Sequence, residues 1–183
     1  IEIFDVDRLS TSPAAFDAKK LEWINNTYVK AASLDEIVDL SLPHLQEAGL
    51  IDGEPGKKEI EWARKLVSLY HDEMSYGAQI VDLSSLFFND DLHIDEASKE
   101  ELSQETASVV IDAMAEKLEA LPAAEFVSEN IKPLMKEIQK ETGVKGRKLF
   151  MPIRIAVSGQ MHGPDLPSVI EVLGKEKALN HIK

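Results

Sequence analysis

Apolar residues recur every three or four positions along most of the chain, which is the period of an amphipathic helix. Leu21, Ile24 and Tyr28 follow this spacing after Asp17, a residue type that commonly caps the start of a helix. Farther along, Ile60, Ala63, Val67 and Tyr70 predict one face of another helix. The pattern therefore predicts a mainly helical chain.

Local signals predict where several helices begin and end. Ser33 is followed three residues later by Glu36, which is the spacing of a capping box. Gly49 and Gly143 are each placed to supply the left-handed residue that ends a helix. Pro43 lies inside the helix that begins after Ser33, so we expect a kink or a break there.

The second half contains further helices and one ambiguous segment. Helices are predicted over 104–121 and about 130–142, with one more between them and a helix–glycine–helix tail from residue 166. Residues 90–105 carry seven acids and one lysine, and we expect an exposed connection there. Residues 147–159 fit a strand or a helix, because β-branched residues occur at helical spacing. The predicted fold class is all-α.

Composition narrows the function classes. The 183 residues include no cysteine, which excludes disulfides and cysteine-based metal or redox sites. No apolar run is long enough for a transmembrane helix. The net charge of −13 argues against nucleic acid. However, residues 132–183 hold ten Lys/Arg against five Asp/Glu, which hints at an anionic partner for this part.

Motifs for catalysis are sparse. The five histidines form no HExxH spacing, and no phosphate-binding loop or GxSxG motif occurs. His71, Asp72 and Glu73 are consecutive and would suggest a hydrolase site, but neighbouring helical residues point in different directions and rarely converge. The residues alone predict no catalytic apparatus.

Two strings carry a family resemblance. Ser12–Asn25 has the pattern Ser-Pro-Ala-x-Phe-Asp-x-x-Lys-Leu-x-Trp-x-Asn, and Leu149–Lys183 has Pro-x-Arg-x-Ala, Ser-Gly, Gly-Pro and Leu-Gly-Lys-Glu in order. Both resemble the C-terminal region of bacterial glutamyl-tRNA synthetases. The stretch Glu73–Phe88 resembles Gram-positive members.

The resemblance implies a division of the chain and its partners. Residues 1–32 would end a stem-contact region, and 33–120 and 121–183 would form two anticodon-binding helical subdomains. The family's His-x-Gly-His and Lys-Met-Ser-Lys-Ser motifs are absent, so we expect a C-terminal piece without catalysis or cofactor of its own. The full-length enzyme is expected to use ATP and Mg²⁺, and the piece to be monomeric and cytoplasmic, with tRNA(Glu) rather than DNA or a membrane as partner.

The loop Ser158–Pro167 contains two glycines and two prolines, more special backbone than a plain turn requires. The resemblance implies that Arg154, Gly163, Pro164 and Leu166 touch anticodon nucleotides. Three basic residues of the preceding loop are predicted to contact phosphates: Lys145, Arg147 and Lys148. Phe150 is predicted to be a core residue, and Trp23 a packing residue.

A second site lies near the end of the helix that contains Tyr70. Many selective family members have an arginine at the position matching Glu73 or Met74, and neither side chain donates hydrogen bonds as arginine does. We therefore predict relaxed selectivity, with tRNA(Gln) also accepted. Ser75 and Tyr76 are further candidate base contacts. The alternative hypothesis from another class is a helical protein-interaction module that uses the acidic residues 90–105.

Overall fold

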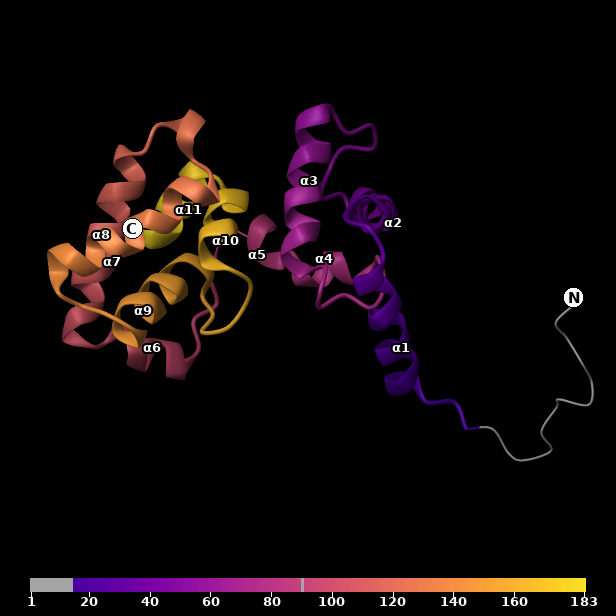
Figure 1. Cartoon of the computed structure of the whole chain (residues 1–183), viewed down its shortest axis with the longest axis horizontal. Coiled ribbons are helices and arrows are strands. Elements are labelled where there is room, and N and C mark those ends of the chain that lie inside the picture. Colours follow the sequence, from indigo (N-terminus) through magenta and orange to yellow (C-terminus); the bar gives the residue numbers. More distant parts are fainter. Residues whose placement is uncertain (1–14, 90) are drawn as a thin grey trace, which may run out of the picture.

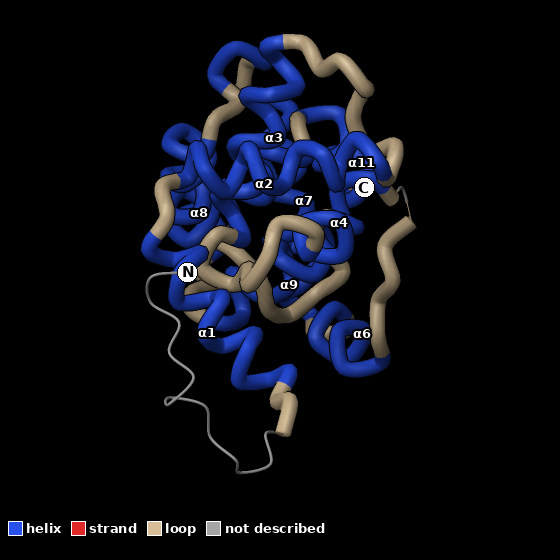
Figure 2. The backbone as a smooth tube through the Cα atoms, turned by 90° about the vertical axis from the view of Figure 1, so that its right-hand side faces the viewer, coloured by secondary structure: helices blue, strands red, loops and turns tan. Residues whose placement is uncertain are grey.

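The computed structural model describes residues 15–89 and 91–183, and these residues form helices joined by loops, with no strand among them (Figures 1 and 2). The predicted all-α class is confirmed. The first helices are α1 (Ala18–Ala31), α2 (Leu34–Glu47), α3 (Lys57–Tyr70), α4 (Gln79–Leu83) and α5 (Ser85–Phe88). They are followed by α6 (Glu96–Leu102), α7 (Glu105–Ala120), the 3-10 helix η2 (Ala123–Glu125), α8 (Ser128–Thr142), α9 (Arg147–Ser158), α10 (Leu166–Leu173) and α11 (Lys175–Ile182).

The predicted helix ends are present. The Asp17 carboxylate accepts from the backbone N–H of Lys20 at 3.1 Å, and Ser33 and Glu36 form a complete capping box. Gly49 and Gly143 have φ values of 69° and 72°. The side chains of Asp17 and Ser33 accept from amide groups that a helix leaves unpaired at its start, and the left-handed glycines end their helices. The short-range sequence signals therefore placed these boundaries correctly.

Three predicted elements differ in part from the structure. Pro43 does not break α2, which continues from Leu34 to Glu47 because Ile37, Val38 and Leu45 are buried on both sides of the proline, and the alternative of a kink stays a prediction. The acidic connection is exposed at most of its described positions, as predicted, but it also contains α6, whose start Asp95 caps by accepting from the Ser98 N–H at 2.7 Å. The helix expected between α7 and α8 is only the 3-10 turn η2.

The ambiguous segment 147–159 is a helix, α9. It packs against α6, α7, α8 and α11 and is therefore buried on several sides. A helix that is covered on several sides can carry apolar residues at most positions, so it loses the polar face that distinguishes a helical pattern from that of a buried strand.

The helices gather into two groups that lie side by side in Figure 1. In the first group α2 packs against α3 and α4, and in the second α7, α8, α9, α10 and α11 pack on one another. α3 and α10 touch across the two groups, and α5 lies between them. The predicted division at residue 120 stays a prediction, but α7 packs mainly on α8, α9 and α11, which follow it, and it also contacts α6, which precedes it.

α1 projects from the first group, and little of its surface is covered (Figure 1). Val29 is its buried residue, whereas Leu21, Trp23 and Tyr28 are exposed. The expectation that Trp23 is a packing residue is not met within the described residues, because 71% of its surface is exposed. Residues 1–14 of the predicted stem-contact region lie outside the described residues. Of the helices described, none has the length and apolar character needed to cross a membrane.

Candidate nucleic-acid interface

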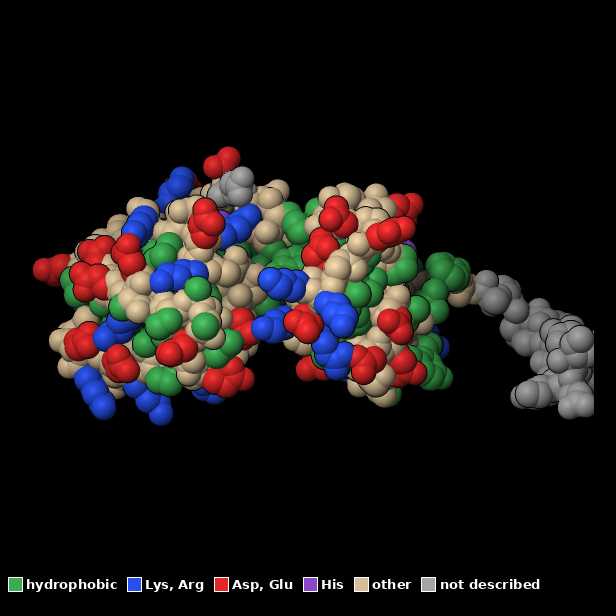
Figure 3. Space-filling view, turned by 90° about the horizontal axis from the view of Figure 1, so that it is seen from above, with side chains coloured by type: hydrophobic (Ala, Val, Ile, Leu, Met, Phe, Trp, Pro, Cys, Tyr) green, Lys and Arg blue, Asp and Glu red, His purple; other side chains and the backbone are tan. Residues whose placement is uncertain are grey.

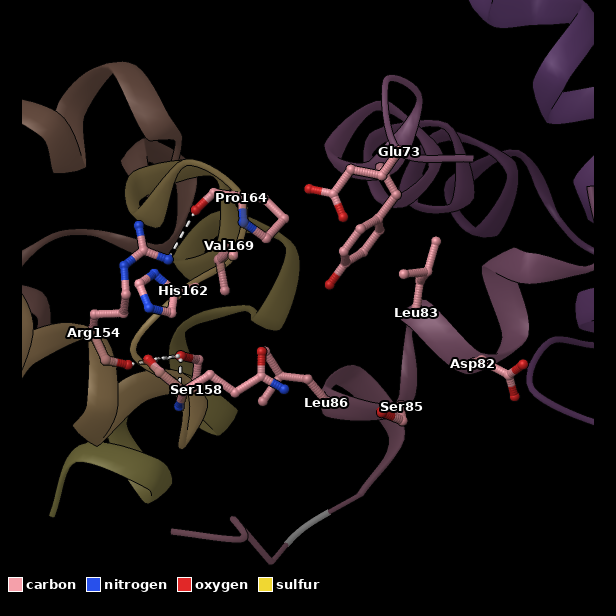
Figure 4. A pocket seen from close by; sticks show the side chains of 13 residues that line it. Glu73, Asp82, Leu83, Ser85, Leu86, Arg154, Ser158, His162, Pro164 and Val169 are labelled. Atoms are coloured by element: carbon pink, nitrogen blue, oxygen red, sulfur yellow. Dashed lines mark hydrogen bonds between the residues drawn. The ribbon is translucent and has the colours of Figure 1, made fainter. Parts of the chain in front are cut away.

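A cleft of about 410 Å³ opens between the two groups of helices, and both sequence-predicted sites border it (Figure 4). On one side it is bordered by the end of α3 and by α4 and α5, and on the other by α9 and the loop that follows it. Its lining residues are Tyr70, Glu73, Asp82, Leu83, Ser85, Leu86, Arg154, Ser158, Gln160, His162, Gly163, Pro164 and Val169. Residues about 80–90 positions apart in the sequence thus face one space.

Arg154 organises one wall of the cleft, the loop 159–165. Its Nη1 donates to the carbonyl oxygen of Pro164 at 3.0 Å, as the dashed line in Figure 4 shows. Burial lowers the pKa of Arg154, and the nearby Asp165 carboxylate acts in the opposite direction. An arginine remains charged at physiological pH. With only one N–H committed to Pro164, the guanidinium retains further donors on a rigid, planar group.

Two glycines shape this loop for different reasons. Gly159 has φ of 69°, and a Cβ there would lie 2.9 Å from the carbonyl oxygen of His93. The loop therefore closely approaches residues 92–93, which precede α6 in the connection between the two groups. Gly163 has φ of 148° with room for a Cβ, whose nearest atom would be Arg154 Nη1 at 3.6 Å. Backbone conformation, rather than space, therefore favours glycine at 163.

The opposite wall is formed by Tyr70, Glu73 and the apolar residues Leu83 and Leu86. The Glu73 carboxylate points across the cleft toward Pro164, whereas the Asp82 carboxylate points away from Arg154 (Figure 4). Asn26 of α1 holds the turn that carries Glu73, since its Nδ2 donates to the carbonyl oxygens of Asp72 and Met74 at 3.1 and 2.7 Å. The cleft thus combines an acceptor wall, a donor wall and apolar surface.

The environment of Tyr70 gives a prediction for alkaline pH. Burial, followed by the charge of Glu73, raises the pKa of the Tyr70 phenol from 10.0 to about 12. The phenol holds its proton more strongly in the folded state than in the unfolded chain. The contribution of Tyr70 to the free energy of unfolding is therefore fully present below about pH 10 and is lost as the pH rises toward about 12. Ultraviolet titration should show one tyrosine that ionises near pH 12 instead of near pH 10. Replacing Glu73 with Gln should lower that pKa slightly, because it removes a nearby negative charge. A normal Tyr70 titration would contradict this.

The remaining predicted contacts near Glu73 and the loop differ in accessibility. Tyr76 is 48% exposed and available, whereas Ser75 is buried. Met74 is 0% exposed and Leu166 is 4% exposed. Contact by the side chains of Met74 and Leu166 therefore stays a prediction that this conformation does not support, because both belong to the core.

The basic residues at the start of α9 lie at the surface. Lys145 precedes the helix, whereas Arg147 and Lys148, which were predicted to lie in a loop, form its first turn. Lys145, Arg147 and Lys148 are all exposed, and Arg147 forms an ion pair with Glu101 of α6. Phosphate contact at these residues stays a prediction. Phe150 is 46% exposed, so its predicted place in the core is wrong. The buried residues around it, Leu149 and Ile153, occupy the helix faces that pack inward.

The alternative chemistries find little structural support. His71 Nε2 lies 2.8 Å from the carbonyl oxygen of Val29 and so is engaged between α1 and α3. Across 15–89 and 91–183, no three His, Cys, Asp or Glu side chains are grouped to hold a metal ion. Part of the acidic segment is used internally, because α6 packs against α9 and Glu101 pairs with Arg147.

Sequence reasoning missed several residues that line the cleft: Tyr70, Leu83, Ser85, Leu86, Gln160, His162 and Val169. Gln160 and His162 lie in the loop already singled out, so their place in it was a usable signal. Tyr70 was assigned to a core face, and the apolar residues of α4 and α5 gave no signal, because only the packing of the two groups brings them to the cleft.

Comparison with known proteins agrees with this arrangement. A family model described as an anticodon binding domain matches residues 36–183. The glutamate–tRNA ligase of Bacillus subtilis is 55% identical over all 183 residues, and that of Listeria monocytogenes is 53% identical over 184 aligned residues. A crystal structure of a glutamate tRNA ligase from Elizabethkingia meningosepticum superposes with a TM-score of 0.79 at 25% identity, covering 98% of this chain and 34% of that one.

The relatives are considerably longer than this chain. The match covers 100% of the chain but 38% of the Bacillus subtilis protein and 37% of the Listeria monocytogenes protein. The similarity therefore concerns one region of those ligases.

Proposed function

The chain belongs to the anticodon-binding domain family, and on this premise we propose that it binds the anticodon loop of a transfer RNA in the cleft between its two groups of helices. The observation that carries the proposal is the convergence of Glu73, Arg154 and Pro164 on one space. RNA sequence is recognised mainly on unpaired bases, because the major groove of an RNA duplex is too narrow for side chains. A cleft with donors, acceptors and apolar surface suits such bases.

The charge distribution supports local rather than long-range attraction. With a net charge of −13, the chain as a whole repels RNA. The ten basic residues of 132–183 include Arg154 in the cleft, the exposed Lys145 before α9 and the exposed Lys148 in its first turn. These groups would position the phosphates while the cleft holds a base.

We also assign the RNA and its context. The relatives are glutamate–tRNA ligases, which favours tRNA(Glu) as the partner. The chain would contribute recognition and no catalytic residue, and ATP and Mg²⁺ would serve the rest of a longer ligase. This assignment rests on the similarity to glutamate–tRNA ligases.

Selectivity at the last anticodon base would be relaxed. Glu73 presents only acceptors to the cleft. The amino group of cytosine and the N–H groups of guanine both donate to a carboxylate, so Glu73 does not separate the two bases as an arginine would. Since these bases distinguish the glutamate and glutamine anticodons, we expect tRNA(Gln) to be bound as well.

Titration with RNA hairpins tests both anticodon-loop binding and relaxed selectivity at the last anticodon base. Three probes share one stem and carry a glutamate anticodon loop, the same loop with its last base changed from C to G, or no loop, as a paired duplex. We expect the two hairpins to bind within about threefold of one another and about tenfold more tightly than the duplex, with affinity falling steeply as salt rises. Equal binding of duplex and hairpins would contradict anticodon recognition, and strong preference for one loop would contradict relaxed selectivity.

A further inference from the structure

Two polar contacts join the groups of helices at a place outside the cleft. The indole Nε1 of Trp62 donates to the carbonyl oxygen of Val172 at 2.9 Å, and Lys65 Nζ lies 2.6 Å from Oε1 of Glu171. Both bonds run from α3 to α10, between residues more than 100 positions apart in the sequence. In the view of Figure 3 the molecule narrows to a waist between the two groups.

The two helices joined by these contacts, α3 and α10, each also carry residues that line the cleft. Along α3, Tyr70 follows Lys65 by five residues, or about 7.5 Å at the rise of an α-helix. Along α10, Val169 lines the cleft and lies between Pro164 and Glu171. A change in the packing of α3 on α10 would therefore move the two walls relative to each other.

Glu171 is fixed within its own group independently of Lys65. Its Oε2 accepts from the backbone N–H of Ser128, the first residue of α8, at 2.8 Å. Burial opposes the charge on Glu171, but the hydrogen bonds from Lys65 and Ser128 outweigh it and lower the pKa of this carboxyl group. The Glu171 side chain is 13% exposed, against 53% for Lys65, so the carboxylate is a partly buried anchor that a more mobile lysine reaches.

Trp62 is held from two sides. Val172 belongs to the last turn of α10, where carbonyl groups lack a partner within the helix, and the indole supplies one. The Trp62 ring also meets Phe88 edge-on, with centroids 5.5 Å apart and an interplanar angle of 76°. Phe88 ends α5 and directly precedes the connection between the two groups.

We infer that the Trp62–Val172 and Lys65–Glu171 contacts form a strut that sets the separation of the cleft walls, which makes Trp62 and Lys65 positioning residues for RNA recognition. Neither side chain lines the cleft. The inference rests on the proposed function for its effect on RNA, whereas its effect on the arrangement of the two groups is independent of any ligand.

The test combines a distance measurement with hairpin binding on the whole chain. Because the sequence has no cysteine, Asp39→Cys and Lys136→Cys introduce two unique sites for spin labels, one exposed position on each group. The strut is weakened by Trp62→Phe with Lys65→Met, changes that keep the aromatic ring and the lysine stem. Lys57→Met, on the exposed first turn of the same helix, is the control of equal charge change.

We expect the distance distribution to broaden in the double variant and to remain unchanged in the control. Preference for the hairpin over the duplex should fall by roughly two- to thirtyfold, the range for residues that act on a site through packing. Restoring the charge with Lys65→Arg, in the presence of Trp62, should return both measurements to those of the unchanged chain.

Each other outcome decides against the inference in a distinguishable way. An unchanged distance distribution overturns the strut whether or not RNA binds. A broadened distribution with unaltered preference for the hairpin overturns the positioning role alone. If the unchanged chain shows no preference for the hairpin, the proposed function fails, and the role in RNA recognition fails with it.

Discussion

Replacing Gly77 with alanine is expected to lower the free energy of unfolding by about 1–3 kcal/mol, the cost of overpacking a tightly packed contact. A Cβ at this position would lie 2.4 Å from the carbonyl oxygen of Leu40 and 2.8 Å from its carbonyl carbon. Both are backbone atoms of α2, so no side chain can rotate away. The segment before α4 would have to separate from α2, and chemical denaturation followed by circular dichroism measures the loss.

Gly53→Ala is the matched control, because a Cβ at that glycine meets nothing within 4 Å. Its effect should stay within about 0.5 kcal/mol, as for ordinary surface changes. The close approach at Gly77 would be refuted if both variants unfolded at the same denaturant concentration. Since the segment starts just after Glu73, weaker hairpin binding should accompany the loss of stability.

Replacing Arg154 with methionine is expected to weaken hairpin binding by about 1–3 kcal/mol, or roughly five- to 150-fold. Methionine keeps most of the stem volume but removes the guanidinium that lines the cleft and holds the Pro164 carbonyl. Arg154→Lys should recover only part of the affinity, since lysine keeps the charge but not the planar set of donors. Fluorescence anisotropy with the hairpin and duplex probes provides the measurement.

Arg147→Met is the control for net charge. Arg147 lies seven residues before Arg154 on α9, which is two helical turns along nearly the same face, but it pairs with Glu101 instead of lining the cleft. We expect it to affect the hairpin and the duplex alike and by much less. Equal losses for the two variants would assign binding to the general charge of α9 and not to the cleft.

The sequence by itself determined the helical class and most helix ends. Asp17, the Ser33–Glu36 pair and Gly143 act on backbone groups within a few residues of themselves, so their effect can be predicted from spacing. It also identified Arg154, Glu73 and Pro164 as candidate contacts, on the basis of a family resemblance and the unusual loop that follows α9.

Only the tertiary structure decided how these pieces combine. It made 147–158 a helix by covering it on several sides. It also buried Met74 and Leu166, and no local signal in the sequence predicted that burial. The cleft exists because α3 meets α10 through contacts between residues more than 100 positions apart. Such contacts depend on how whole apolar faces pack, and no short stretch of the sequence carries that information.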